Sequence, residues 1–318
     1  MTPSSIKNVS ESKILFAIEG FILEIYQLGF REEFKSDFKE LLEHFDRIYN
    51  IDYHYCDYCA VFVELKSLVD QIRYDPYCNH DWHNYNFVLD LNNEQLKELE
   101  QLIKKRKGDI QKELVQFYAQ ENDNTTSLET YASQLFKHYS KLLIVRVDLG
   151  YRNDAKHEIT IDRFYRDFEK MRNRLANKDT IFNNLHGYAW ALEQGKGRGY
   201  HVHMLLIYDG SKVQKGSYYA KRVGEKWVEL TEGRGTYFNP HNKQYIDELK
   251  LKGCEIGLGM VSNKKDNDWE RLHSVIRYFT ACNKDLQRLR VKNEKNMQTF
   301  GKGQYGNSKR RGIGIKTA

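Results

Sequence analysis

The sequence has few of the residues that divide a chain into flexible, cross-linked or membrane-bound parts. Its 318 residues include only 3 prolines and no long run of glycine and serine, so we expect no extended disordered linker. No apolar stretch approaches the ~20 residues that a membrane-spanning helix needs, and residues 1–12 lack the pattern of a signal peptide. We therefore expect a cytoplasmic protein with its 5 cysteines reduced.

Charge is distributed unevenly along the chain. Residues 1–140 hold 15 basic and 24 acidic side chains, a net charge of −9, whereas residues 141–318 hold 35 and 20, a net charge of +15. The last 35 residues alone carry 10 basic and 2 acidic side chains. Such a gradient is typical of a protein in which one end meets a polyanion, and it favours nucleic acid as the partner. A solvated basic tail that aids solubility is the alternative.

The first half of the chain has the apolar spacing of helices. Apolar residues recur three and four positions apart in residues 14–28, 34–48 and 94–103, with Asn93 as the expected N-cap of the last helix. The polar residues 121–127 are the expected domain boundary, followed by one more helix. We therefore predict a mainly helical N-terminal region over residues 1–127.

The second half has a different pattern, in which strands and helices alternate. The expected strands are residues 142–149, 187–194, 200–208 and 256–261, and the expected helices are residues 160–175 and 268–282. This order predicts an α+β fold, an antiparallel sheet of about five strands flanked by helices. We place this domain at residues 128–306, with a basic tail at residues 307–318.

A candidate metal site lies in the expected hairpin. Residues two apart on a strand share a face, so His201 and His203 point the same way. If the hairpin closes about Gly197, Glu193 lies directly across from His201. Two imidazoles and one carboxylate then converge and leave coordination positions open, which suits a catalytic divalent ion. A hydrogen-bonded pair of structural histidines is the alternative.

A tyrosine on the last expected helix is the candidate nucleophile. Tyr278 lies at the edge of an apolar stripe formed by Leu272, Val275 and Phe279. A phenol has an ordinary pKa near 10, so a metal ion or the nearby cations Arg277 and Lys284 must help it to act as phenolate. With 22 tyrosines in the chain, a tyrosine at the edge of the core is the plain alternative.

These motifs resemble those of the HUH endonucleases, which are named for a His-hydrophobe-His motif. More narrowly, residues 144–306 are similar to the inovirus gene II-type replication proteins, also called the YagK/YfjJ C-terminal domain family. The matching landmarks are residues 146–151, the hairpin from Glu193 to Tyr208, Tyr278-Phe-Thr, and Phe300-Gly-Lys-Gly303.

The resemblance implies a fold, a reaction and partners. It implies metal ligands on a central sheet and a helix that presents the tyrosine, with Mg²⁺ or Mn²⁺ as cofactor. The implied reaction is rolling-circle initiation: the tyrosine attacks single-stranded origin DNA, retains the 5′ end and releases a 3′ hydroxyl. A host helicase and polymerase would then extend that end. By position, His201 and His203 match the histidine pair and Tyr278 the nucleophile, and Glu193 is our choice for the acidic ligand.

The chain departs from the family pattern in two places. The family commonly has a lysine about three residues after the tyrosine, where this chain has Ala281, and the nearest lysine is Lys284. No second tyrosine lies one turn from Tyr278, so we expect a single-tyrosine enzyme. We expect DNA contacts from four cations, which are Lys196, Arg198, Arg277 and Lys284.

Three further hypotheses remain open. The spacing of Cys56, Cys59, Cys78 and His80 resembles a structural zinc site, although a pair of buried cysteines on a helix would give the same pattern. For the whole protein, a non-catalytic DNA- or RNA-binding protein on the same fold is the main alternative to a nicking enzyme. A metal-dependent phosphohydrolase that uses water is a third interpretation.

Overall fold

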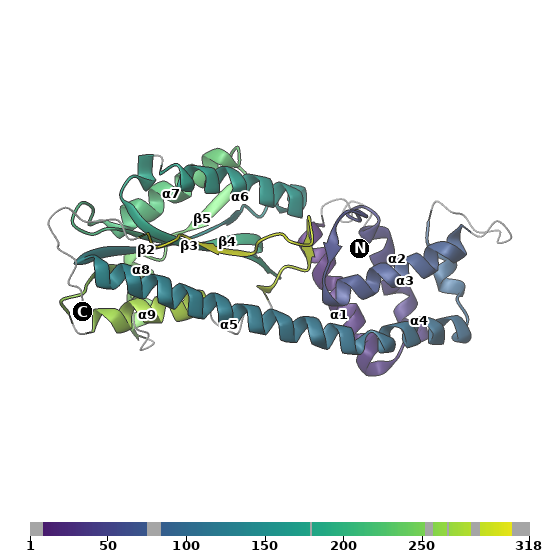
Figure 1. The fold of residues 1–318 in the computed structure, drawn as a ribbon. Coiled ribbons are helices and arrows are strands. Elements are labelled where there is room, and N and C mark those ends of the chain that lie inside the picture. The colour runs from purple at the N-terminus through teal and green to yellow at the C-terminus, as the bar shows by residue number, and fades with distance from the viewer. Residues whose placement is uncertain are drawn as a thin grey trace.

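The computed structural model describes residues 9–74, 84–178, 180–251, 257–265, 267–280 and 287–306, without the side chains of Leu249, Lys250 and Tyr278. Helices from the first third of the chain form one end of the molecule, and a sheet with helices on both faces forms the other (Figure 1). The long helix α5 (Lys107–His138) runs along both parts. The protein is therefore an α+β fold preceded by a helical region, as the sequence predicts.

The N-terminal region is built around packed aromatic side chains. Its helices are α1 (Glu11–Leu28), α2 (Lys35–Phe45), α3 (Asp57–Arg73) and α4 (Asn93–Lys105). Phe21, Phe38 and Phe62 from three of these helices meet in stacked and edge-to-face pairs at centroid distances of 5.5–6.4 Å. The N-cap of α4 is Asn92 rather than the predicted Asn93, because the Asn92 side chain accepts hydrogen bonds from the first turn in a capping box.

Helix α5 corrects the predicted boundary at residues 121–127. These polar residues lie inside one continuous helix of 32 residues. The Thr125 and Thr126 hydroxyls donate to the carbonyls of Glu121 and Asn122 at 2.8 and 3.0 Å, so the polar side chains are satisfied within the helix. The stretch contains no glycine or proline to break the helix. The expected division between residues 127 and 128 thus falls in the middle of an element.

Among the residues that the structure describes, the sheet has six antiparallel strands. Five lie in the order β5-β2-β4-β3-β8, and β6 also pairs with β2. Their bounds are β2 (Lys141–Tyr151), β3 (Leu185–Gly195), β4 (Gly199–Asp209), β5 (Gly235–Phe238), β6 (Gly259–Ser262) and β8 (Phe300–Lys302). The predicted strand over residues 256–261 corresponds to β6, and residues 252–256 lie outside the described ranges. Strands β2 and β4 at the centre are buried along almost their whole length.

Different helices cover the two faces of the sheet. Helices α6 (Ile161–Ala176) and α7 (Gly216–Leu230) lie on one face, and α9 (Asp268–Phe279) with the C-terminal half of α5 lies on the other (Figure 1). On β4, Leu205 and Ile207 join the core beneath α5 and α9, whereas Leu206 and Tyr208 join the core beneath α6 and α7. This alternation places His201 and His203 on the α9 face. Helix α8 (Lys243–Leu251) follows β5.

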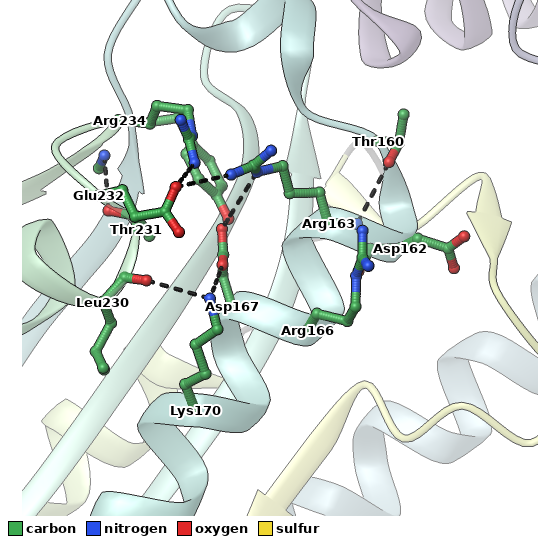
Figure 2. Close-up of polar contacts among 12 residues, drawn as sticks. Thr160, Asp162, Arg163, Arg166, Asp167, Lys170, Leu230, Thr231, Glu232 and Arg234 are labelled. Carbon is green, nitrogen blue, oxygen red and sulfur yellow. Dashed lines mark hydrogen bonds and ion pairs between the residues drawn. The ribbon is translucent and has the colours of Figure 1, made fainter.

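Polar contacts join α6 to the end of α7 (Figure 2). Asp167 on α6 is buried and accepts hydrogen bonds from Lys170 at 2.9 Å and from the Tyr151 hydroxyl at 3.2 Å. Lys170 also donates to the carbonyl of Leu230, and Arg163 pairs with Glu232 at 3.5 Å. The Thr160 side chain caps α6 by accepting from the Arg163 amide. These contacts hold both helices against the sheet face opposite the histidines.

Residues 287–302, which we call the return segment, connect the two ends of the molecule. Strand β7 (Val291–Lys292) pairs with β1 (His54–Tyr55) of the N-terminal region, and β8 then pairs with β3. Figure 1 shows this segment in yellow between the sheet and the N-terminal helices. Within the described ranges, no helix combines the length and apolar character needed to cross a lipid bilayer.

Candidate metal centre

The β3–β4 hairpin has the predicted register. Glu193 lies directly opposite His201, and the strands close at the pair Gly195 and Gly199. Gly199 has φ +70°, a left-handed conformation that a side chain would strain, which explains a glycine at this corner of the turn. The tight turn therefore fixes the register that brings the carboxylate to the histidines.

The three predicted ligands form one compact, buried cluster. A single carboxylate oxygen, Glu193 Oε2, lies 3.1 Å from His203 Nε2 and 3.4 Å from His201 Nε2. One ligand atom from each residue lies within 4.8 Å of the others, and all three side chains are buried. Among the described residues, this is the one group of three or more histidine, cysteine and acidic side chains that is close enough to hold a metal ion.

Hydrogen bonds fix the tautomers of both histidines. His203 Nδ1 lies 2.7 Å from Asp148 Oδ1, and His201 Nδ1 lies 2.9 Å from the carbonyl oxygen of Gly199. Carboxylate and carbonyl oxygens only accept, so each Nδ1 carries a hydrogen, and Nε2 of each ring is the nitrogen that faces Glu193 and could ligate a cation in place of a proton. His201 Nε2 is buried without a hydrogen-bond partner. Two Nε2 atoms free of protons and one carboxylate would be the donor set for a divalent cation.

Asp148 and Arg146 support the cluster from strand β2. Asp148 is the register partner of His203, and the Arg146 guanidinium donates two hydrogen bonds of 2.8 Å to its carboxylate. Burial alone would raise the pKa of Asp148, but the hydrogen bond and charge of His203 and the charge of Arg146 outweigh it and hold that pKa below its usual value. Asp148 therefore stays ionised and orients the imidazole of His203.

The same carboxylates affect His203. Burial opposes its protonation, yet the hydrogen bonds to Asp148 and Glu193 raise its pKa above the ordinary value. The cluster thus attracts positive charge at His203 Nε2, where a bound cation would replace a proton.

The C-terminal end of α9 reaches this cluster. The Phe279 ring lies 6.5 Å from the His203 ring, centroid to centroid, and Leu272 and Val275 pack into the core shared with β4. Tyr278 immediately precedes Phe279 in the helix, and its side chain lies outside the described residues. The fold thus brings Phe279, the residue that follows the predicted nucleophile, to the metal ligands, although 74 residues separate Tyr278 from His203 in the sequence.

Comparison with known proteins identifies the family of this domain. A sequence model described as the YagK/YfjJ C-terminal domain matches residues 104–302. The chain belongs to the YagK/YfjJ C-terminal domain family. The match runs from the end of α4 to β8, so it contains the whole sheet, the metal-ligand cluster and the return segment. No curated protein and no solved structure matches the chain.

A basic hollow borders the cluster of this YagK/YfjJ domain. It has a volume of about 250 Å³, and its lining includes Asp148, His201, Lys156, Arg198 and Phe238. Lys156 Nζ donates to the carbonyl of Gly197 at 2.8 Å. Burial, and then the charges of Lys13 and Arg198, lower the pKa of Lys156. We call this space the Arg198 hollow.

The four cations predicted to contact DNA have different positions. Lys196 and Arg198 are exposed in the hairpin turn, and Arg198 lies 3.7 Å from Asp148. Arg277 is exposed on α9, and Lys284 lies outside the described residues. Two aromatic residues of β5, Tyr237 and Phe238, also line the Arg198 hollow and were not predicted.

The cysteine hypothesis is covered only in part by the described residues. Cys78 and His80 lie outside them. Cys56 and Cys59 both carry free thiols, and Cys59 is buried with its sulfur 3.6 Å from the carbonyl of Leu15. Burial raises the pKa of the Cys56 thiol to about 12 and that of Cys59 well above its ordinary value. Cys59 therefore has the surroundings of a core residue.

Proposed function

We propose that this protein is a metal-dependent endonuclease of the HUH type, which nicks single-stranded DNA through Tyr278 and thereby initiates rolling-circle replication. The observation that carries the proposal is the cluster of Glu193, His201 and His203, in which both Nε2 atoms face one carboxylate oxygen. A protein that only binds nucleic acid has no need of such a buried set of charged and lone-pair groups, which costs free energy without a cation.

The proposed reaction is a transesterification. The Tyr278 phenolate oxygen forms a bond to phosphorus as the bond from phosphorus to the 3′ oxygen breaks. The products are a 5′-phosphotyrosine and a 3′ alkoxide, which takes a proton to become the free 3′ hydroxyl. A divalent ion, when bound, neutralises the charge that develops on the phosphoryl oxygens. The protein's own contribution is to hold the ligands in fixed tautomers and to place the end of α9 beside them.

The surroundings of the cluster fit a nucleic acid strand. Lys156 and Arg198 offer cations to phosphates beside the ligands, and Phe238 offers an exposed ring on which a base could stack. We propose Mg²⁺ or Mn²⁺ as the cofactor because nitrogen and oxygen donors with open positions suit catalytic ions that also contact phosphate. Single-stranded origin DNA is the proposed substrate, with a host helicase and polymerase as later partners.

The deciding experiment looks for the covalent intermediate. The protein is incubated with circular single-stranded DNA and Mn²⁺, and a denaturing gel resolves any protein–DNA adduct. We expect an adduct with the wild type and none with Tyr278→Phe, which removes only the attacking oxygen. Tyr188→Phe on β3 is the matched control and should retain the adduct.

Two outcomes would overturn the assignment in different ways. An adduct formed by Tyr278→Phe would mean that another tyrosine is the nucleophile. Cleavage without any adduct in the wild type would mean that water attacks and that the protein is a hydrolase. Binding without cleavage or adduct under all metal conditions would favour the non-catalytic DNA- or RNA-binding protein.

A further inference from the structure

A second, larger space adjoins the cluster on the side away from the Arg198 hollow. It has a volume of about 480 Å³, within the ~300–1,000 Å³ of typical ligand pockets. Its walls come from β3, from the middle of α5, from the return segment and from β1 with the start of α3. Glu193 forms part of the β3 wall, so this Glu193 cavity begins at a metal ligand and extends toward the N-terminal region.

Buried contacts fix the walls of the cavity. Arg288 of the return segment donates hydrogen bonds to Asp57 and to Glu19, and all three side chains are buried. The amide of Arg290 donates to the Gln194 side chain at 2.9 Å, next to Glu193. The Asp57 amide donates to Glu113 of α5 at 2.7 Å. The cavity is therefore preformed by contacts that α1 and α3 make with α5 and with the return segment. Neither the helices before residue 104 nor the matched family domain forms it alone.

The chemistry of the walls suits a nucleobase attached to a phosphate. Phe117 of α5 and Phe300 of β8 contribute aromatic rings, and Gln116 and Gln120 contribute amides that donate and accept hydrogen bonds. The lining contains both acidic and basic side chains, so the interior of the cavity favours an uncharged nucleobase over a negatively charged phosphate. Lys292 and Lys295 also line the cavity, and Lys295 is exposed, where a phosphate of the same nucleotide can meet it.

We propose that the Glu193 cavity receives one base of the single-stranded DNA next to the scissile phosphate, so that the N-terminal region forms part of the DNA-binding site. The strand passes from the Arg198 hollow across the metal ligands to this cavity. The inference rests on the proposed function for its substrate, but it concerns where the strand lies and not whether it is cut. A free nucleotide and a nucleotide within a DNA strand would offer the same chemistry to this cavity, and we assign the DNA strand as the ligand.

The test uses Tyr278→Phe protein, which cannot form the proposed adduct, so that binding is measured apart from nicking. Single-stranded oligonucleotides with bromodeoxyuridine in place of thymidine are irradiated with the protein, and cross-linked peptides are mapped by mass spectrometry. We expect cross-links at Phe117 or Phe300. Cross-links confined to Tyr237, Phe238 and other residues of the Arg198 hollow would overturn the proposal.

A matched pair of variants on α5 provides a second measurement. Phe117 lines the cavity and Tyr118 beside it does not. In the Tyr278→Phe background, Phe117→Ala should weaken binding of a fluorescent oligothymidylate about tenfold, the size of one lost base-stacking contact. Tyr118→Ala should leave the affinity within about twofold, and thermal melting should show both variants folded. Equal affinities for the two variants would contradict the proposal.

Thymidine monophosphate alone separates the two sources of a nucleotide. If the strand is the ligand, millimolar thymidine monophosphate should compete only weakly with the oligonucleotide, because a single nucleotide lacks the contacts at the Arg198 hollow. Tight binding of the mononucleotide that is lost in Phe117→Ala would instead identify a site for free nucleotides and would refute the assignment to DNA. A nicking assay that fails while these cross-links form would refute the proposed function and leave this inference intact.

Discussion

Asp148→Asn gives the sharpest test of how the cluster binds metal. The substitution keeps the shape of the side chain but removes the charge that accepts the hydrogen of His203 Nδ1 at 2.7 Å. An asparagine can turn its amide nitrogen toward the ring, which favours the tautomer with the hydrogen on Nε2 and blocks that atom as a ligand. Loss of such a supporting carboxylate typically lowers metal affinity about 10- to 100-fold, which is about 1.4–2.7 kcal/mol.

The substitution also affects stability, and the two effects must be measured separately. The buried Arg146 guanidinium donates two hydrogen bonds to Asp148, so the change leaves a buried cation without its carboxylate. Removing one partner of a buried ion pair typically costs about 3–5 kcal/mol. Urea unfolding measures this loss, and Mn²⁺ titration by calorimetry below the unfolding range measures the affinity.

Asp167→Asn is the matched control. Asp167 is also a buried aspartate that holds a cation, Lys170, but it lies on α6 at the opposite face of the sheet. It should lose stability while its affinity for Mn²⁺ stays that of the wild type. If Asp148→Asn binds Mn²⁺ as tightly as Asp167→Asn, then Asp148 neither orients His203 nor sets its tautomer.

Three further predictions concern His203, the basic tail and Glu11. His203→Ala should abolish nicking and Mn²⁺ binding but leave DNA affinity largely intact in a filter-binding assay, since surface cations supply that affinity; equal loss of both would argue against a catalytic role. Deleting residues 307–318, which hold four cations, should flatten the slope of log affinity against log salt by up to about 3, and an unchanged slope would show that this tail does not contact DNA. Burial raises the pKa of Glu11 to about 7, against the lowering effect of hydrogen bonds from Tyr200 and the Ile161 amide and with a raising charge from Asp162. The folded state therefore keeps a proton that the unfolded chain loses, and stability should fall by about 3 kcal/mol as pH rises from 4.5 to 7. Glu11→Gln should remove this fall in urea unfolding curves, whereas the exposed Glu24→Gln of the same helix should keep it; parallel profiles for the two variants would contradict the assignment.

The candidate site was predictable to the extent that it depends on local spacing. A strand with His201 and His203 two apart, a short glycine-rich turn and Glu193 at the mirrored position together determine a shared face. Asp148 and Arg146 were missed as site residues because they come from β2, whose pairing with β4 is not encoded by any turn between them. The sequence does show Arg146 and Asp148 two residues apart on a predicted strand, but charged residues with this spacing are also common on exposed faces of strands.

The predicted boundary at residues 121–127 failed for a different reason. Polar side chains indicate a loop when they take backbone hydrogen-bonding groups away from the helix. Here the threonine hydroxyls instead donate to carbonyls of the preceding turn, and the helix continues. Residues of α5 such as Leu128 pack into the core beneath the sheet and supply the free energy that propensity lacks. Composition along the chain cannot show that tertiary packing.

The connections between the two ends of the molecule argue against treating the N-terminal region as an accessory. Glu11 of α1 accepts a hydrogen bond from Tyr200, the residue before the first histidine ligand, at 2.6 Å. Glu19 of the same helix accepts from Arg288 and Arg290 of the return segment, and Arg290 in turn bonds Gln194 beside the acidic ligand. A buried charge left without its partner is costly. Separating the N-terminal region from the sheet would leave the side chains of these ion pairs and hydrogen bonds exposed or without partners. The acidic half of the chain is therefore part of the structure that positions the metal ligands, and a fragment that begins where the family match begins, at residue 104, should hold those ligands less firmly than the full chain.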